Sequence, residues 1–266
     1  MRRSGVFWGI VVILAGLILL VQQFYGLPSG FWPVFWSSIL ILLGLWFLMG
    51  PVWFKREIKN TPFTVPLEGA SEGDIRIRYG AGKLQIGALE AESSALVSGN
   101  CTGGVDLDVN RGQQRTKVRL HTPHDGFWGF PDGFGAQGLD WGLGLNRGIP
   151  LRIKLDTGAS ENILELADLL VRELEVQTGA SDTRITLPAA AGKTRVEIHS
   201  GAASVTIRLP EGVAGRIQVE SGLSNINVDD SRFPRVADRF ETPGFDDAVN
   251  KADIFIKTGV GSVDIH

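Results

Sequence analysis

The sequence predicts a mainly β protein, in which a repeat-built β-solenoid or a related stack of β units follows an N-terminal two-helix transmembrane hairpin. Three observations predict this class. No charged residue or histidine occurs from Ser4 to Phe54, residues beyond Asn60 alternate between apolar and polar, and glycines recur there every 21 to 22 residues. We therefore divide the chain into a membrane segment, residues 1–59, and a β domain, residues 60–266.

The uncharged segment contains two apolar runs separated by polar and turn-forming residues at 22–30. Extended to Phe24, the first run is long enough for a helix that crosses a bilayer, and Val34–Trp53 is a second run of similar length. Lipid offers backbone groups no partner outside their own helix, so two runs predict a helical hairpin. A cleaved signal peptide is the alternative for the first run, but no small-x-small cleavage site follows it and the second span comes directly after.

Basic residues flank the hairpin on both sides. Arg2 and Arg3 precede it, Lys55, Arg56 and Lys59 follow it, and the connecting loop has none. The positive-inside rule therefore predicts that both termini and the β domain lie on the cytoplasmic side of the inner membrane. Apart from Arg2 and Arg3, the chain has 24 basic and 29 acidic residues. This acidic balance argues against nucleic acid as a partner.

The β domain repeats one unit, which is an alternating strand, a glycine-containing turn and a second alternating strand. The turn glycines are Gly158, Gly179, Gly201, Gly222 and Gly259. A fixed period of this length is typical of stacked architectures, in which each unit buries its apolar face against its neighbours. The last interval is longer, and we interpret Asp229–Asp247 within it as an inserted loop. Periodicity leaves a closed solenoid and paired sheets as alternatives.

Both parts of the chain resemble a known family. The uncharged hairpin is similar to the membrane segment of LiaF-type proteins of the bacterial cell-wall-antibiotic response. Residues 79–86, the Thr-Gly-Ala-Ser units and the terminal residues 258–265 resemble the toast-rack β domain of the same proteins. The resemblance implies a membrane-bound regulator without catalytic residues, which tunes an envelope-stress sensor kinase in signal transduction.

Three short motifs imitate functional sites. Asp156 lies in the Asp-Thr-Gly sequence of aspartic proteases, but that chemistry needs two carboxylates sharing a proton, and the equivalent position varies among the repeats. Residues 106–110 begin like an EF-hand loop but lack its glycine and closing glutamate. The two histidines and the aspartate at 121–125 are too few ligands for a tight metal site. We therefore expect no enzyme, cofactor or metal, and a structural role for the single Cys101.

A Gly-rich aromatic segment at about 121–150 is expected to be a loop. It contains the candidate contact residues Phe127, Trp128, Phe130, Phe134 and Trp141. One interpretation is that the loop folds its aromatic side chains over one end of the stack, because solenoid ends must be covered. The other is an exposed patch that docks to lipid or to a partner's transmembrane region.

These features together predict a non-enzymatic, membrane-anchored regulator that tunes an envelope-stress sensor through protein–protein contacts. Its expected partners are the lipid bilayer and a membrane sensor kinase or another membrane protein. The alternative is a membrane-bound β scaffold that forms homo-oligomers through the ends of the stack, because uncovered strand edges pair with copies of themselves.

Overall fold

The computed structural model describes residues 13, 36–42, 60–122 and 139–266. The chain divides into two compact units, and the larger one, Ile58–Asp125 with Ala136–His266, carries the β fold. The hairpin predicted within residues 1–59 lies almost entirely outside the described residues, of which residue 13 and residues 36–42 are helical. No helix in the described part of the chain is both long and apolar enough to cross a membrane.

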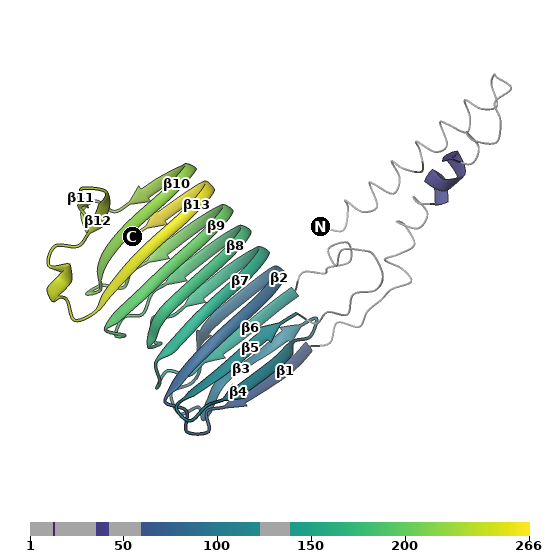
Figure 1. Ribbon diagram of the computed structural model, residues 1–266, viewed down its shortest axis with the longest axis horizontal. Coiled ribbons are helices and arrows are strands. Elements are labelled where there is room, and N and C mark those ends of the chain that lie inside the picture. The colour runs from purple at the N-terminus through teal and green to yellow at the C-terminus, as the bar shows by residue number, and fades with distance from the viewer. Residues whose placement is uncertain (1–12, 14–35, 43–59, 123–138) are drawn as a thin grey trace, which may run out of the picture. The chain divides into compact units, whose positions relative to one another are not determined.

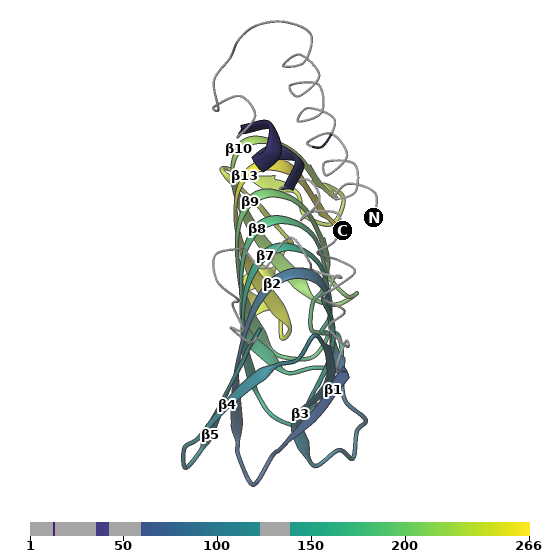
Figure 2. The ribbon, with the colours of Figure 1, turned by 90° about the vertical axis from the view of Figure 1, so that its right-hand side faces the viewer.

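Long parallel strands form the centre of the larger unit (Figure 1). They are β2 (Glu72–Ala88), β7 (Leu151–Glu165), β8 (Val171–Thr186), β9 (Lys193–Arg208), β10 (Ala214–Val228) and β13 (Lys251–Ile265). Each strand bends near its middle, so that the strands arch over a common ridge and their halves form two facing sheets (Figure 2). The protein is therefore mainly β with a stacked, toast-rack-like arrangement, which confirms that part of the predicted fold class.

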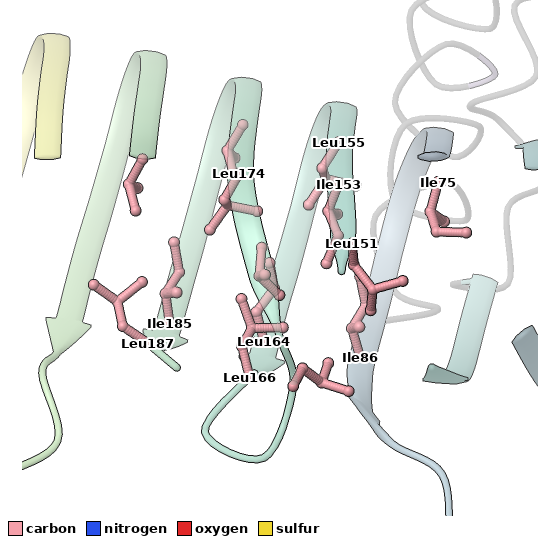
Figure 3. Packing of buried hydrophobic residues seen from close by; sticks show 14 of the residues in the cluster. Ile75, Ile86, Leu151, Ile153, Leu155, Leu164, Leu166, Leu174, Ile185 and Leu187 are labelled. Atoms are coloured by element: carbon pink, nitrogen blue, oxygen red, sulfur yellow. The ribbon is translucent and has the colours of Figure 1, made fainter. Parts of the chain in front are cut away.

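Apolar side chains from both halves of each arch fill the space between the sheets. On β7, Ile153 and Leu155 before the ridge and Leu164 after it are at most 1% exposed, and all three belong to the packed cluster drawn in Figure 3. In the next layer Ile153 pairs with Leu174 and Leu155 with Val176, which are also buried. Burying one such side chain contributes roughly 1.5–3 kcal/mol relative to its exposure, so each layer stabilises its neighbours by covering their apolar side chains.

The repeated glycines lie on the ridge, one in each layer. A Cβ atom at Gly158 would lie 2.5 Å from the carbonyl oxygen of Gly80, and one at Gly179 would lie 3.0 Å from that of Gly158. The same approach recurs at Gly201 and Gly259. A side chain therefore does not fit where the arches turn, which explains why a glycine recurs once in each of these layers.

The spatial order of the long strands differs from their order in the sequence. β13 lies between β9 and β10 and pairs in parallel with both. The stretch Asp229–Asp247, interpreted as an inserted loop, contains β11 (Arg235–Val236), β12 (Arg239–Glu241) and the 3-10 helix η1 (Phe245–Asp247). It returns the chain from the end of β10 to the start of β13. As a result β10, and not the C-terminal strand, is the last long strand of the stack.

The stack has features of both alternatives that periodicity leaves open. β7, β8 and β9 are joined by short connections at 166–170 and 187–192, so the chain coils as it does in a solenoid. The two halves of every coil nevertheless belong to two facing sheets (Figure 2). The fold therefore combines solenoid connectivity with paired sheets.

The two sheets continue separately beyond β2. The shorter strands at this end are β5 (Arg115–His121), β4 (Asp106–Arg111), β6 (Leu139–Leu145), β3 (Ala95–Thr102) and β1 (Asn60–Pro66). The first half of β2 pairs with β5, which pairs with β4, whereas its second half pairs with β6, followed by β3 and β1. β6 lies within the segment expected to be a loop at about 121–150, and this expectation is corrected. Its glycines obscure an alternation of buried and exposed positions that forms a strand.

Candidate interaction surface

β10 has a full-length strand partner on one side only. Its inner side pairs with β13 from Ala214 to Val228. On its outer side only Arg216 and Ile217 pair with another strand, β12. In the described part of the chain no strand lies beside the remaining outer edge, from Gln218 onward. Its backbone donors and acceptors are therefore available to an additional strand.

The apolar core opens at the same edge. Ile226 is 37% exposed, whereas its register neighbours Val263 on β13 and Val205 on β9 are fully buried. Val228 is also only partly buried and packs against the core from the edge. At the ridge, Leu223 is 80% exposed. The apolar side chain at the level of Ile226 is thus covered in the two adjacent layers and uncovered at β10.

The free edges at the opposite end of the stack carry features that discourage strand pairing. β1 has prolines at positions 62 and 66, and β4 has Asp106, Asp108 and Arg111. Proline removes a backbone donor, and charged side chains oppose edge-to-edge association. From Ser221 to Val228, β10 contains neither proline nor a charged residue. This difference singles out β10 among the long exposed edges of the described strands.

A small cap, which we define as residues 235–247, covers part of the β10 end (Figure 1). Its strands β12 and β11 extend the sheet formed by the first halves of the long strands. The sheet formed by the second halves has no such extension and ends at β10 in the described residues. The two sheets therefore end at different levels. We call the resulting surface the β10 step and define it by the edge 223–228 and the cap residues Arg235 and Phe240.

A charged cluster helps to fix the cap to the stack. The Arg216 guanidinium donates from Nε to Oε2 of Glu241 at 2.7 Å and from Nη2 to Oδ1 of Asp246 at 2.9 Å. Its centre lies 4.1 Å from the centroid of the Phe245 ring. The hydrogen bond from Arg216 is the main cause that lowers the pKa of Glu241 below its ordinary value. This arrangement holds β12 against the first half of β10.

The sequence-predicted contact residues are only partly described by the structure. Phe127, Trp128, Phe130 and Phe134 lie outside the described residues. Trp141 is fully buried on β6, where its ring centroid lies 5.1 Å from that of Tyr79. Its place in the core removes it from an exposed contact patch, because alternation on β6 turns this side chain inward.

Two of the three imitated motifs lie on regular strands, whereas only residues 121 and 122 of the third, at 121–125, belong to the described residues. Asp156 lies on β7, and its register neighbours are Arg78 and Gln177 rather than a second carboxylate. On β4, Asp108 forms an ion pair with Arg119 at 2.8 Å. The acidic residues at 106–108 thus belong to a strand, and strand geometry accounts for their spacing.

The β10 step was not recognised from the sequence, although one signal for it is present. The residue after the ridge glycine is alanine at 159, 180 and 202, valine at 260 in the inner layer β13, and leucine at 223 in β10. Leu223 is the largest of these residues and the more exposed of the two larger ones, at 80% against 54% for Val260. The change from alanine to a larger apolar residue therefore marks the β10 end of the stack.

Comparison with known proteins identifies the fold of the stack. The family model described as the N-terminal domain of toast_rack, DUF2154, matches residues 54–208. This match ends before β10, so the β10 step lies beyond it. No curated protein matches the chain.

Two crystal structures are similar to the chain. One is a candidate cell adhesion protein from Clostridium sporogenes ATCC 15579, with 21% identity and a TM-score of 0.71 over 79% of this chain and 99% of that one. The other is a candidate adhesin from Bacteroides fragilis NCTC 9343, with 10% identity and a TM-score of 0.33 over 80% of this chain and 98% of that one. The first similarity shows that the stacked β fold occurs in a solved structure.

Proposed function

The chain belongs to the toast_rack family through the N-terminal domain of toast_rack, DUF2154, and from this premise we propose that it is a non-enzymatic protein that acts through protein–protein contacts at the β10 step. The observation that carries the proposal is the uncovered edge 223–228 beside an open apolar core. A strand edge provides affinity through backbone hydrogen bonds, and the space beside Ile226 provides selectivity for a side chain.

Membrane anchorage is the second part of the proposal. The uncharged segment from Ser4 to Phe54 and the basic residues at 55, 56 and 59 support a two-span anchor with the β domain on the cytoplasmic side of the inner membrane. In this arrangement the anchor keeps the β10 step near other membrane proteins. Restriction to the membrane raises the effective concentration of such partners, so a weak strand-addition contact is sufficient.

The resemblance to LiaF-type proteins supports a regulatory role. In the proposed mechanism, the protein binds a membrane sensor kinase of the envelope-stress response and changes its activity by contact alone. The alternative, a self-associating membrane-bound β scaffold, uses the same edge with a second copy of the chain as partner. Both versions require the β10 step to be free for binding.

In-membrane crosslinking tests this proposal. A photoreactive residue at position 226 of the full-length chain is expected to form covalent adducts with a membrane protein, identified by mass spectrometry. The matched control is the same photoreactive residue at Leu107 on β4, which is 39% exposed against 37% for Ile226. Equal adduct yields from the two positions, or adducts only at 107, would overturn the assignment of the contact to the β10 step.

A second experiment separates regulation from scaffolding. In cells exposed to a cell-wall antibiotic, Ile226→Asp is expected to change the output of the stress-response reporter, whereas Leu107→Asp leaves it unchanged. Aspartate removes the apolar contact and places an uncompensated charge on the pairing edge. A reporter output that is unaffected by Ile226→Asp, despite normal protein levels, would contradict the regulatory version.

A further inference from the structure

The β10 step has the shape of a slot that is two strands wide. On one sheet, β12 and β11 extend beyond β10, and on the other sheet nothing does in the described residues. The cap therefore overhangs the place where two further strands of the second sheet would lie. Phe240 packs against the core from the inner side of the cap, and Arg235, its direct register partner, lies on the same face.

We propose that the occupant of this slot is the cap of a second copy of the same chain, which gives a two-fold symmetric dimer in which each cap completes the other copy's shorter sheet. This inference rests on the proposed contact function of the β10 step and names its partner. The slot is two strands wide because β12 and β11 extend the opposite sheet by two strands. The cap of a second copy contributes the same two strands, so its width matches that of the slot. A two-fold axis through the ridge places the cap of one copy over the free edge of the other on both sides at once.

Strand directions agree with this arrangement. The first half of β10 runs toward the ridge, β12 is antiparallel to it, and β11 is antiparallel to β12. β11 therefore runs toward the ridge, whereas residues 223–228 of β10 run away from it. A two-fold axis perpendicular to the ridge preserves both directions, so β11 of one copy meets the free edge of the other in the antiparallel orientation. Antiparallel pairing allows regular hydrogen bonds between the two edges.

The side chains on the two surfaces are also complementary. The apolar residues that the dimer would cover are Ile226 and Val228 on the edge and Phe240 on the cap. Asp229 and Asp230 follow the free edge and are exposed. The cap contributes the exposed Arg235, whose guanidinium lies 5.8 Å from the Phe240 ring centroid. The acidic end of the edge thus lies near Arg235 on the outermost strand of the cap, which favours this partner over a surface with a carboxylate at that place.

The level of each residue along the arch predicts which positions meet. Arg235 pairs with Phe240, which pairs with Ile217, five residues before the ridge glycine Gly222. Val228 lies six residues after that glycine and faces the core, as Arg235 does. Because directly opposed residues of an antiparallel pair share a face, position 235 of one copy should lie beside position 228 of the other, whereas two copies of position 228 lie on opposite sides of the axis.

Cysteine crosslinking in membranes tests this geometry with the full-length chain. Two differently tagged copies, one carrying Arg235→Cys and the other Val228→Cys, are co-expressed and oxidised. The expected result is a covalent dimer in the mixed sample and its loss when either variant is expressed alone, because a disulfide requires Cα atoms within about 7 Å. The natural Cys101 is buried, so the unsubstituted chain measures its background.

Three outcomes decide between the proposals. A crosslink from Val228→Cys alone, or no crosslink in the mixed sample, overturns the interlocked dimer. If the mixed sample gives no dimer while position 226 still crosslinks to another membrane protein, the further inference fails and the proposed function stands. A mixed-sample dimer that is lost on adding Ile226→Asp, but kept on adding Leu107→Asp, supports the interlocked arrangement.

Discussion

The side-chain amide of Asn162 on β7 donates a hydrogen bond from Nδ2 to Oγ1 of Thr183 on β8 at 3.0 Å, inside the core. Both residues are fully buried. The positions on either side in the same register are apolar, Leu84 on β2 and Val205 on β9. A polar pair therefore interrupts an otherwise apolar column in two adjacent layers.

Breaking this pair from one side should destabilise the stack. Thr183→Val leaves the Asn162 amide without its acceptor, and a buried unsatisfied donor costs about 1–3 kcal/mol. The double variant Asn162→Leu with Thr183→Val continues the apolar column and is expected to be more stable than the single variant. Thermal unfolding of the full-length chain in detergent measures both, and a double variant less stable than Thr183→Val would refute this account.

Adding one methyl group on the ridge should test the glycine stacking. In Gly158→Ala the new Cβ would lie 2.5 Å from the carbonyl oxygen of Gly80, so the layers must separate. Overpacking of this kind costs about 1–3 kcal/mol. Gly80→Ala is the matched control, since its Cβ would meet no atom within 4 Å. Equal unfolding temperatures for the two variants would show that the close approach is not limiting.

The layers of the stack could be predicted from the sequence because their causes are local. The alternation around Ile153 and Leu155 gives each half strand a buried face, and the spacing from Gly158 to Gly179 gives one bend per layer. Both patterns are set by contacts that recur in every layer, so they are visible in a single chain. The prediction of a mainly β, stacked domain follows from them.

The order of the strands and the β10 step could not be predicted in the same way. The alternation of apolar and polar residues is the same in every layer, so it does not indicate which layers are neighbours. The insertion of β13 between β9 and β10 therefore depends on the path of residues 229–247 rather than on periodicity. That path decides which strand has a free edge. Similarly, the glycines around Trp141 obscure the alternation of β6, so from the sequence this tryptophan is only a candidate contact residue in a loop.

Trp141 should behave as a core residue. It is fully buried against Tyr79, so Trp141→Ala is expected to lower the stability by about 3–5 kcal/mol through the cavity it creates. Trp141→Phe keeps most of the apolar volume and should cost less. Differential scanning fluorimetry can rank the three proteins. An unchanged melting temperature combined with loss of partner crosslinking at position 226 would instead assign Trp141 to a contact.

The thiol of Cys101 should be unreactive in the folded protein. Burial raises its pKa to about 12, so the nucleophilic thiolate is scarce at pH 8 and the sulfur is covered as well. A thiol-specific chromogenic reagent at pH 8 is expected to react with the single cysteine only after denaturation. Rapid labelling of the native chain would contradict the burial of β3, on which Cys101 lies.

The attachment of the cap should depend on pH through Glu241. Its pKa is lowered in the folded protein, mainly by the hydrogen bond from Arg216, so the folded state binds fewer protons than the unfolded state around the ordinary value of 4.5. The stabilisation is therefore present above pH 4.5 and is lost as the pH falls through the lower, folded-state pKa.

Glu241→Gln tests this dependence, because it removes the titrating carboxyl while keeping a hydrogen-bond acceptor for Arg216. At pH 7 this variant should show faster amide hydrogen exchange in residues 235–247 than the unsubstituted chain. After correction for intrinsic rates, its exchange in these residues should not rise further between pH 5 and pH 3. In the unsubstituted chain the corrected exchange should rise over that range. Glu165→Gln on the exposed outer face of β7 is the control. If both variants keep the full pH response, the Arg216–Glu241 pair does not hold the cap in place.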